Sequence, residues 1–276
     1  MINIGSYNEL VVEREVDFGL YLNKKPEEVL LPRKYVPKNT NIGDTLRVFV
    51  YLDSEERPVA TTLEPKAVVG ECAYLRATDI TAFGAFLDWG LEKDLLVPGK
   101  EQPVKMKKGK KYVVKVCRDE KDGRIYASAN IKRHCQDQSA DLTPGQKVEL
   151  LIYNLTDFAF TAVIDNNFTG ILYKDQLFES IRIGDRRIGY IHKIRDDGKI
   201  DLTLKQPGYH SIKESSDIVL SYLKENDGVI PYHDKSTPEE IKRAFSMSKK
   251  EFKRAIGKLY KNGIITIADQ GIRLRQ

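Results

Sequence analysis

The residues with the clearest chemical potential are aromatic side chains at short spacing in segments rich in β-branched residues. Phe83 and Phe86 lie in the segment FGAFL, and Phe18 and Tyr21 lie at the same spacing in FGLYL. Every nucleobase has a π-face, so exposed aromatic rings can stack on a single strand without demanding a sequence. The alternative is that these rings are core residues of small β-domains, where aromatic strand residues are usually found.

Two lysine-rich segments offer a second chemistry, the neutralisation of phosphate groups. One is KMKKGKK at 105–111, and the other opens a helical pattern near the C-terminus. Lys and Arg outnumber Asp and Glu in 70–141 and in 211–276, but not in 1–69 or 142–210. The alternative is an ordinary solvated surface. The basic candidates are Lys107, Lys108, Lys110, Lys111, Lys249, Lys250, Lys253 and Arg254.

Catalytic and metal chemistry find little support in the sequence. The three cysteines have no CxxC spacing, and only one of the four histidines, His134, has a cysteine beside it. No P-loop, GxGxxG or nucleophile–base spacing occurs, so we expect no enzyme, no cofactor and no metal. The first twenty residues do not resemble a signal peptide, and no apolar run approaches about 18 residues. We therefore expect a cytoplasmic protein without a membrane partner.

The elements that must position these residues repeat three times along the chain. Each copy has an aromatic residue followed by Gly or Ala, a short apolar run, a turn glycine and a closing hairpin. Corresponding landmarks lie 65 or 66 residues apart between the first two copies and 75 apart between the last two. The aromatic residues are Phe18, Phe83 and Phe158, and the turn glycines are Gly43, Gly109 and Gly184. Such constant spacing indicates tandem domains.

Each copy predicts about five short strands and little helix, which is typical of an OB-type Greek-key barrel. The additional residues between the second and third copies form a polar stretch at 130–144 that ends in Pro144 and Gly145. We interpret this stretch as an interdomain linker, and we expect its part around Asp137–Thr143 to let the first two copies move relative to the rest of the chain.

The last quarter of the sequence changes to a helical pattern. STPEEIKRAF predicts a helix with Thr237 as its N-cap and Glu240 three residues later, and MSKKEFKRAIGKLYKNG predicts another that begins after Ser248. A strand, a turn and a second strand follow. A further helix is predicted before these two helices, in ESSDIVLSYLKEND at 214–227. Three helices and a two-stranded wing predict a winged helix-turn-helix, whose last helix commonly enters a groove or touches phosphates.

The pattern at 70–128 resembles the RNA-binding S1 domain. By this resemblance Phe83 and Phe86 lie on one exposed face, with Asp119 and Arg124 on a nearby strand. The corresponding residues of the first copy are Phe18, Tyr21, Asp53 and Arg57.

The three copies depart from the S1 pattern in different ways. Most S1 domains carry a histidine after the apolar run, where this chain has Pro32, Pro98 and Tyr173. The third copy also has Thr161 at the second aromatic position and Arg195 in place of the aspartate. Its ligand face is therefore degenerate, with Tyr173 as the remaining candidate contact. The second copy is the best candidate for direct binding.

Over nearly the whole chain, three S1-like units followed by a winged helix look like the bacterial conserved virulence factor B family. The resemblance implies a mostly β protein of OB-type barrels at 1–68, 69–135 and 142–208, with an α+β winged-helix domain at 211–276. It also implies RNA binding with a regulatory role.

We expect single-stranded RNA as the partner. Two alternatives stay open: a DNA-binding regulator that acts through the winged helix, and an adaptor that contacts ribosomal or RNA-degradation proteins.

Overall fold

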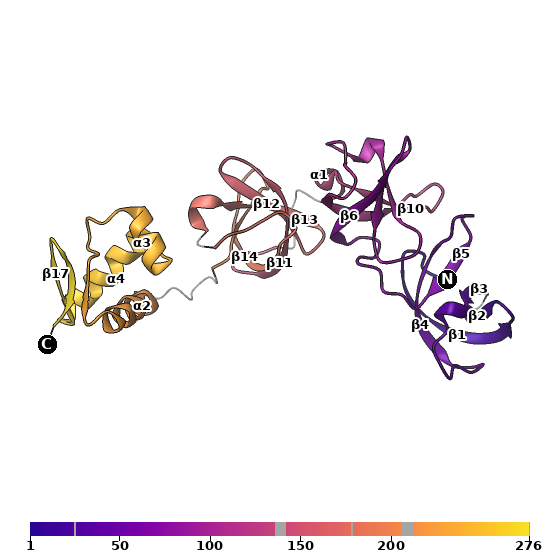
Figure 1. The fold of residues 1–276 in the computed structure, drawn as a ribbon, viewed down its shortest axis with the longest axis horizontal. Coiled ribbons are helices and arrows are strands. Elements are labelled where there is room, and N and C mark those ends of the chain that lie inside the picture. Colours follow the sequence, from indigo (N-terminus) through magenta and orange to yellow (C-terminus); the bar gives the residue numbers. More distant parts are fainter. Residues whose placement is uncertain (25, 136–141, 178, 206–211, 276) are drawn as a thin grey trace.

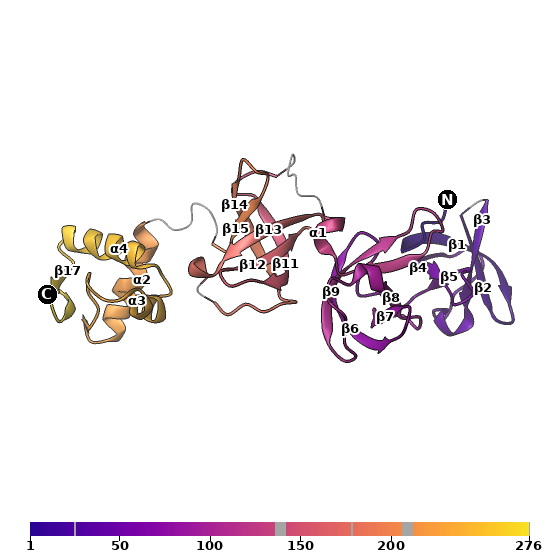
Figure 2. The ribbon, with the colours of Figure 1, turned by 90° about the horizontal axis from the view of Figure 1, so that it is seen from above.

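The structure is a computed structural model that describes residues 1–24, 26–135, 142–177, 179–205 and 212–275. Figures 1 and 2 show the domains following one another in chain order along an elongated molecule. Three β-domains are followed by a mixed α+β domain at the C-terminus, as predicted. Among the described residues, every helix is too short or too polar to span a lipid bilayer.

Each β-domain has five strands, and in each the first strand pairs with both the second and the fourth. The first and third domains are closed barrels, and the second is a five-stranded sheet with the same strand order, nearly closed. We call them barrels 1, 2 and 3. Barrel 1 contains β1 (Ser6–Val16), β2 (Gly19–Lys24), β3 (Glu27–Pro32), β4 (Thr45–Leu52) and β5 (Pro58–Thr61). Barrel 2 contains β6 (Cys72–Ile80), β7 (Gly84–Asp88), β8 (Leu95–Pro98), β9 (Lys111–Arg118) and β10 (Ile125–Ser128). Barrel 3 contains β11 (Lys147–Leu155), β12 (Ala159–Ile164), β13 (Phe168–Tyr173), β14 (Arg186–Ile194) and β15 (Ile200–Thr203).

The turn glycine has the same function in all three barrels, which explains the constant spacing of the repeat. The amide of Gly109 donates to the carbonyl of Ala77 on β6 at 2.8 Å. Gly43 and Gly184 make the equivalent 2.8 Å bonds to the first strands of barrels 1 and 3. All three glycines have positive φ, between +82° and +93°, a conformation that glycine adopts at low cost. The register of the first strand shifts just after the bonded residue in each barrel.

Barrels 1 and 2 are joined by an apolar cluster in which Phe49 and Tyr51 of barrel 1 pack on the core of barrel 2, whereas the interior of barrel 1 has a core of its own. Phe49 of β4 is fully buried and packs edge-on against Trp89 of barrel 2, with ring centroids 5.7 Å apart. Lys93 donates to the carbonyls of Leu52 and Asp53 at 3.0 and 2.6 Å. Barrel 1 therefore packs directly against barrel 2.

Barrels 2 and 3 also share a buried interface. Ile131, at the start of α1 (Ile131–His134), and Cys135 pack in one apolar cluster with Leu151 and Val163 of barrel 3. The Lys115 ammonium donates to the Asn166 carbonyl at 2.9 Å, and the Asn166 side chain accepts from the Cys72 amide at 2.8 Å.

The interpretation of 130–144 as a loose linker is therefore wrong for its first part. The stretch is polar overall, but two of its residues, Ile131 and Cys135, are apolar and are buried against barrel 3. Residues 136–141 lie outside the described residues, and the movement expected around Asp137–Thr143 falls mostly on them.

The C-terminal domain has the predicted order of helices and strands, with one addition. The predicted capping box is present, because Thr237 accepts from the Glu240 amide and Glu240 accepts from the Thr237 amide. Ser248 caps the last helix by accepting from the Glu251 amide at 3.2 Å. The wing has three strands instead of two, since β16 pairs with β18. The elements are α2 (Ile212–Glu225), β16 (Val229–Ile230), α3 (Pro238–Phe245), α4 (Lys249–Lys261), β17 (Ile265–Ala268) and β18 (Gly271–Leu274).

Candidate nucleic-acid interface

Phe83 lies outside the core of barrel 2, at the turn between β6 and β7. Its side chain is 80% exposed, which excludes the alternative that it is a core residue. The next residue, Gly84, lies so close to β8 that a Cβ there would come within 2.2 Å of the Val97 carbonyl oxygen. Glycine therefore lets β7 begin tight against β8 while the preceding ring projects into solvent.

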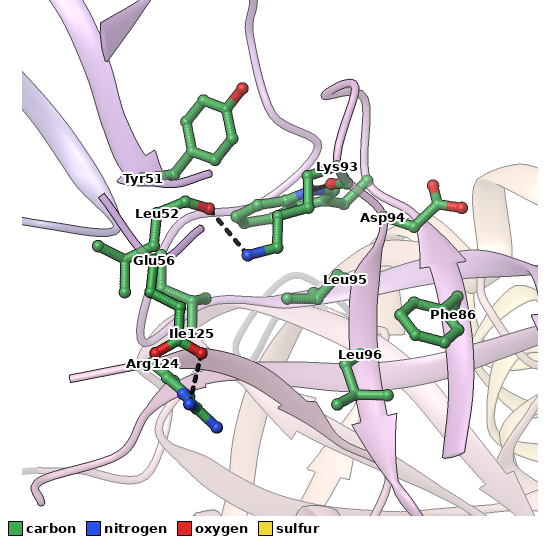
Figure 3. Close-up of a pocket in the computed structure, with 11 residues that line it drawn as sticks. Tyr51, Leu52, Glu56, Phe86, Lys93, Asp94, Leu95, Leu96, Arg124 and Ile125 are labelled. Atoms are coloured by element: carbon green, nitrogen blue, oxygen red, sulfur yellow. Dashed lines mark hydrogen bonds and ion pairs between the residues drawn. The ribbon is translucent and has the colours of Figure 1, made fainter. Parts of the chain in front are cut away.

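Phe86 lies on the outward side of β7, since its neighbours Ala85 and Leu87 are fully buried in the core. The side chain is half-buried and lines a pocket of about 190 Å³ between barrels 1 and 2 (Figure 3). Trp89 and Tyr51 contribute further aromatic surface to this pocket. The position of Phe86 is therefore intermediate between core and open surface.

Arg124 lines the same pocket, and its side chain is held by an ion pair with barrel 1. Its guanidinium forms an ion pair with Glu56 and lies 3.4 Å from Asp122, as Figure 3 shows for Glu56. Asp119 does not line the pocket, and its carboxylate accepts from the Lys121 amide at 2.8 Å. The structure thus brings Arg124 and Phe86 to one pocket and leaves Asp119 in the hairpin turn.

The lysine-rich turn lies beside the outward face of β7. Lys107, Lys108, Lys110 and Lys111 are all exposed. The Lys108 ammonium is 3.1 Å from the Asp79 carboxylate, and Asp79 is the cross-strand neighbour of Phe86. No ion pair joins the other three lysines to a described residue. Barrel 2 therefore places exposed positive charge next to its outward aromatic residues.

Barrel 1 repeats the aromatic pair with one ring partly covered. Phe18 is 58% exposed, and the Tyr21 ring lies edge-on to it with centroids 6.4 Å apart. The Arg14 guanidinium stacks on Tyr21, 3.6 Å from the ring centroid. Arg57 pairs with the Asp53 carboxylate at 2.9 Å. One face of Tyr21 is therefore occupied within the chain, and Phe18 is the more open ring.

Barrel 3 has a pocket on the face that the sequence analysis described as a degenerate ligand face. Phe158 is 74% exposed and lines a pocket of about 400 Å³ together with Thr161 and Tyr173. Arg195 does not reach the lining. It binds the Asp201 carboxylate and the Tyr173 hydroxyl. The pocket also includes two cations that the sequence analysis missed, Lys132 and Lys199. Lys199 lies 75 residues after Arg124, which is the spacing between the second and third copies, so the repeat could have identified it.

The winged helix places its basic candidates on the exposed side of α4. Lys250, Lys253 and Arg254 are exposed and pair with no acidic group in the described part of the chain. Lys249 is half-buried, and its ammonium lies 3.5 Å from the carbonyl of Lys235. The only acidic residue of the helix, Glu251, turns toward Ser215 and toward Lys205 of barrel 3, at 3.0 and 3.4 Å.

Two family models match the ends of the chain. A model described as S1 domain matches residues 4–63, and one described as CvfB-like winged helix domain matches residues 217–274. The S1 match falls on barrel 1, although the sequence pattern was clearest in barrel 2.

Similar proteins extend over most of the chain. The uncharacterized protein YitL of Bacillus subtilis is 29% identical over 94% of this chain and 89% of its own length. Conserved virulence factor B of Staphylococcus saprophyticus is 27% identical over 85% of this chain and 81% of its own. A crystal structure of a multidomain protein with nucleic acid binding domains from Streptococcus pneumoniae is 25% identical, covering 99% of this chain and 98% of that one, with a TM-score of 0.42. An S1 domain at one end, a CvfB-like winged helix domain at the other and sequence similarity over most of the length confirm that the chain is related to the conserved virulence factor B proteins.

Proposed function

We propose that this protein binds single-stranded RNA with little sequence preference, as a regulatory protein and not as an enzyme. The S1 and winged-helix domains support a role in binding nucleic acid. The observation that carries the choice of a single strand is the exposure of Phe83, in the same barrel as the exposed lysine-rich turn. In a duplex the faces of the bases are stacked on one another, so an exposed ring finds its partner most readily on an unpaired strand.

The chemistry divides between two groups of side chains. Stacking on Phe83 and Phe86 would contribute about 1–3 kcal/mol per base without reading the base edges. The lysines of the turn would contact the backbone, a contribution that weakens as salt rises. Lys107 and Lys110 have no ion pair among the described residues, so their charge is available to phosphates without breaking a contact.

The test replaces the aromatic rings and leaves every charge in place. We expect the double variant Phe83→Ala, Phe86→Ala to lose about 2–6 kcal/mol of binding free energy for a single-stranded RNA oligonucleotide, measured by fluorescence anisotropy. Val104→Ala is the matched control, because Val104 is an exposed apolar residue of the same barrel that does not line the pocket. Wild-type affinity in the folded double variant would refute stacking by barrel 2.

A second candidate is duplex DNA binding by the winged helix, which the uncompensated charges of α4 favour. Titrations of the same protein with single-stranded RNA and duplex DNA at equal salt distinguish the two. We expect the tighter binding on the single strand. If neither nucleic acid binds, the adaptor alternative gains, and pull-downs with and without ribonuclease would test it.

A further inference from the structure

The pocket between barrels 1 and 2 lies at a seam that the other two barrels close. In barrel 1 the third and fifth strands pair in parallel at Leu30 and Val59, and β13 and β15 of barrel 3 pair in the same way. In barrel 2 the corresponding strands, β8 and β10, are the two edges of the sheet. The repeat spacing of 66 leads from Leu30 and Val59 to Leu96 and Ile125, and both of these line the pocket. We call this space of about 190 Å³ the seam pocket.

Barrel 1 covers the open seam with the end of β4 and the hairpin that leads to β5. Tyr51 and Leu52 of β4 and Glu56 of the hairpin line the seam pocket on this side (Figure 3). The ion pair between Glu56 and Arg124 joins the hairpin to barrel 2. The contacts between the two barrels therefore enclose a space at the seam instead of filling it.

The walls of the seam pocket are aromatic and aliphatic. Tyr51 and Trp89 are buried, and the half-buried Phe86 lies on the β7 side. The aliphatic part of the lining consists of Leu52, Leu95, Leu96 and Ile125. An apolar cavity of about 150 Å³ in a protein interior binds benzene. The seam pocket is somewhat larger, so it has room for one aromatic ring with a small substituent.

The Lys93 ammonium is the polar group of the lining that has a donor to spare. It donates to the carbonyls of Leu52 and Asp53 at 3.0 and 2.6 Å. An ammonium has three N–H donors, so one of them is left without a partner in the described part of the chain. Burial lowers the pKa of Lys93 from its ordinary value, because its present contacts do not make up for the lost water. A bound anion would supply the missing compensation.

The other charged side chains of the lining are compensated within the protein. Glu56 and Arg124 pair with each other. The Asp94 carboxylate accepts from the Thr78 hydroxyl at 2.6 Å, and Figure 3 shows it pointing away from Lys93. A ligand therefore meets apolar walls and one available positive donor. A single carboxylate matches this donor, whereas a ligand with several negative charges would leave most of them unpaired in an apolar space.

We propose that the seam pocket binds a small aromatic carboxylate, with its ring between Phe86 and Trp89 and its carboxylate on Lys93. This site is separate from the proposed binding of nucleic acid, which needs open rings and exposed lysines and not an enclosed pocket. Because both barrels contribute to the lining, a bound ligand stabilises the junction between them.

The probe for this site is benzoate, titrated into the full-length protein. Trp89 is the only tryptophan of the chain, so tryptophan emission reports on this pocket alone. Benzoate should change the emission in a saturable way, and amide exchange in β8 and β10 should slow. Acetate lacks the ring and benzamide lacks the charge, so each should bind at least about tenfold more weakly.

Two substitutions test the pocket and the carboxylate contact separately. Leu96→Phe fills the pocket without touching Lys93, and it should abolish the response to benzoate. Val104→Phe is the matched control, because Val104 is exposed on the same barrel and does not line the pocket. Lys93→Met should weaken benzoate by about tenfold or more and leave the weak binding of benzamide nearly unchanged.

The outcomes are distinct. A saturable response to benzoate that Leu96→Phe abolishes and Val104→Phe retains, with weaker binding by Lys93→Met, supports the proposal. Tryptophan emission that millimolar benzoate leaves unchanged overturns it. Equal binding of benzoate and benzamide, or wild-type benzoate affinity in Lys93→Met, overturns the assignment of a carboxylate ligand. Competitive displacement of benzoate by single-stranded RNA overturns the separation of this site from the nucleic-acid interface.

Discussion

Removing the basic residues of α4 should change the salt dependence of binding by an amount that the structure allows us to estimate. The variant replaces Lys249, Lys250, Lys253 and Arg254 with Gln. Three of the four are exposed and unpaired within the described chain, whereas Lys249 already contacts a backbone carbonyl. We therefore count three phosphate contacts.

Each contact with a single strand contributes about 0.7 to the slope of log affinity against log salt. Three contacts flatten the slope by about 2 units, which corresponds to an affinity loss of about a hundredfold at 0.1 M salt and almost none near 1 M. The loss should be the same for oligonucleotides of different sequence, because phosphates carry no sequence information. Fluorescence anisotropy titrations at four or more salt concentrations measure both quantities.

The aromatic variants of barrel 2 should affect the salt dependence of binding differently. Phe83→Ala with Phe86→Ala removes no charge, so affinity should fall while the slope stays that of the wild type. A quadruple Gln variant that keeps the wild-type slope would refute the assignment of α4 to phosphate contacts. The exposed face of α4 would then belong to solvent or to a protein partner.

Two further predictions concern packing and thiol chemistry. Phe49→Ala should destabilise barrel 2 and its contact with barrel 1 by about 3–5 kcal/mol, because Phe49 is fully buried in the cluster that joins barrel 1 to the core of barrel 2; hydrogen exchange that increases in barrel 1 alone would contradict this. Burial raises the pKa of the Cys117 thiol to about 11, so iodoacetamide should label it slowly at pH 8 and about tenfold faster per pH unit up to that pKa. Labelling of the native protein at pH 8 as fast as that of the urea-unfolded chain would show that the thiol is not protected.

The fold could be predicted from the sequence because its strongest signals are local. A turn glycine with positive φ bonds to the same point of the first strand in every barrel, and this requirement keeps Gly43, Gly109 and Gly184 in constant register. The caps at Thr237 and Ser248 likewise depend on residues only three positions away.

Contacts between domains could not be predicted in the same way. Arg124 lines one pocket with Phe86, but its ion pair with Glu56 of the preceding barrel was not predicted. Ile131 was concealed in a polar stretch and packs on barrel 3. Such contacts join positions far apart in the sequence, and no local pattern marks them.

The candidate site was predicted in part. The exposure of Phe83 follows from the turn and from Gly84, both of which the sequence displays.

The apolar cluster that joins barrel 1 to the core of barrel 2 limits how this chain can be divided. A fragment that started at residue 69 would keep Trp89 and lose Phe49, exposing an indole that is now 3% accessible. Such a fragment would tend to aggregate through this new apolar surface. Although the repeat unit is one barrel, barrel 2 therefore has to be excised or transferred together with barrel 1, and its junction with barrel 3 is buried as well.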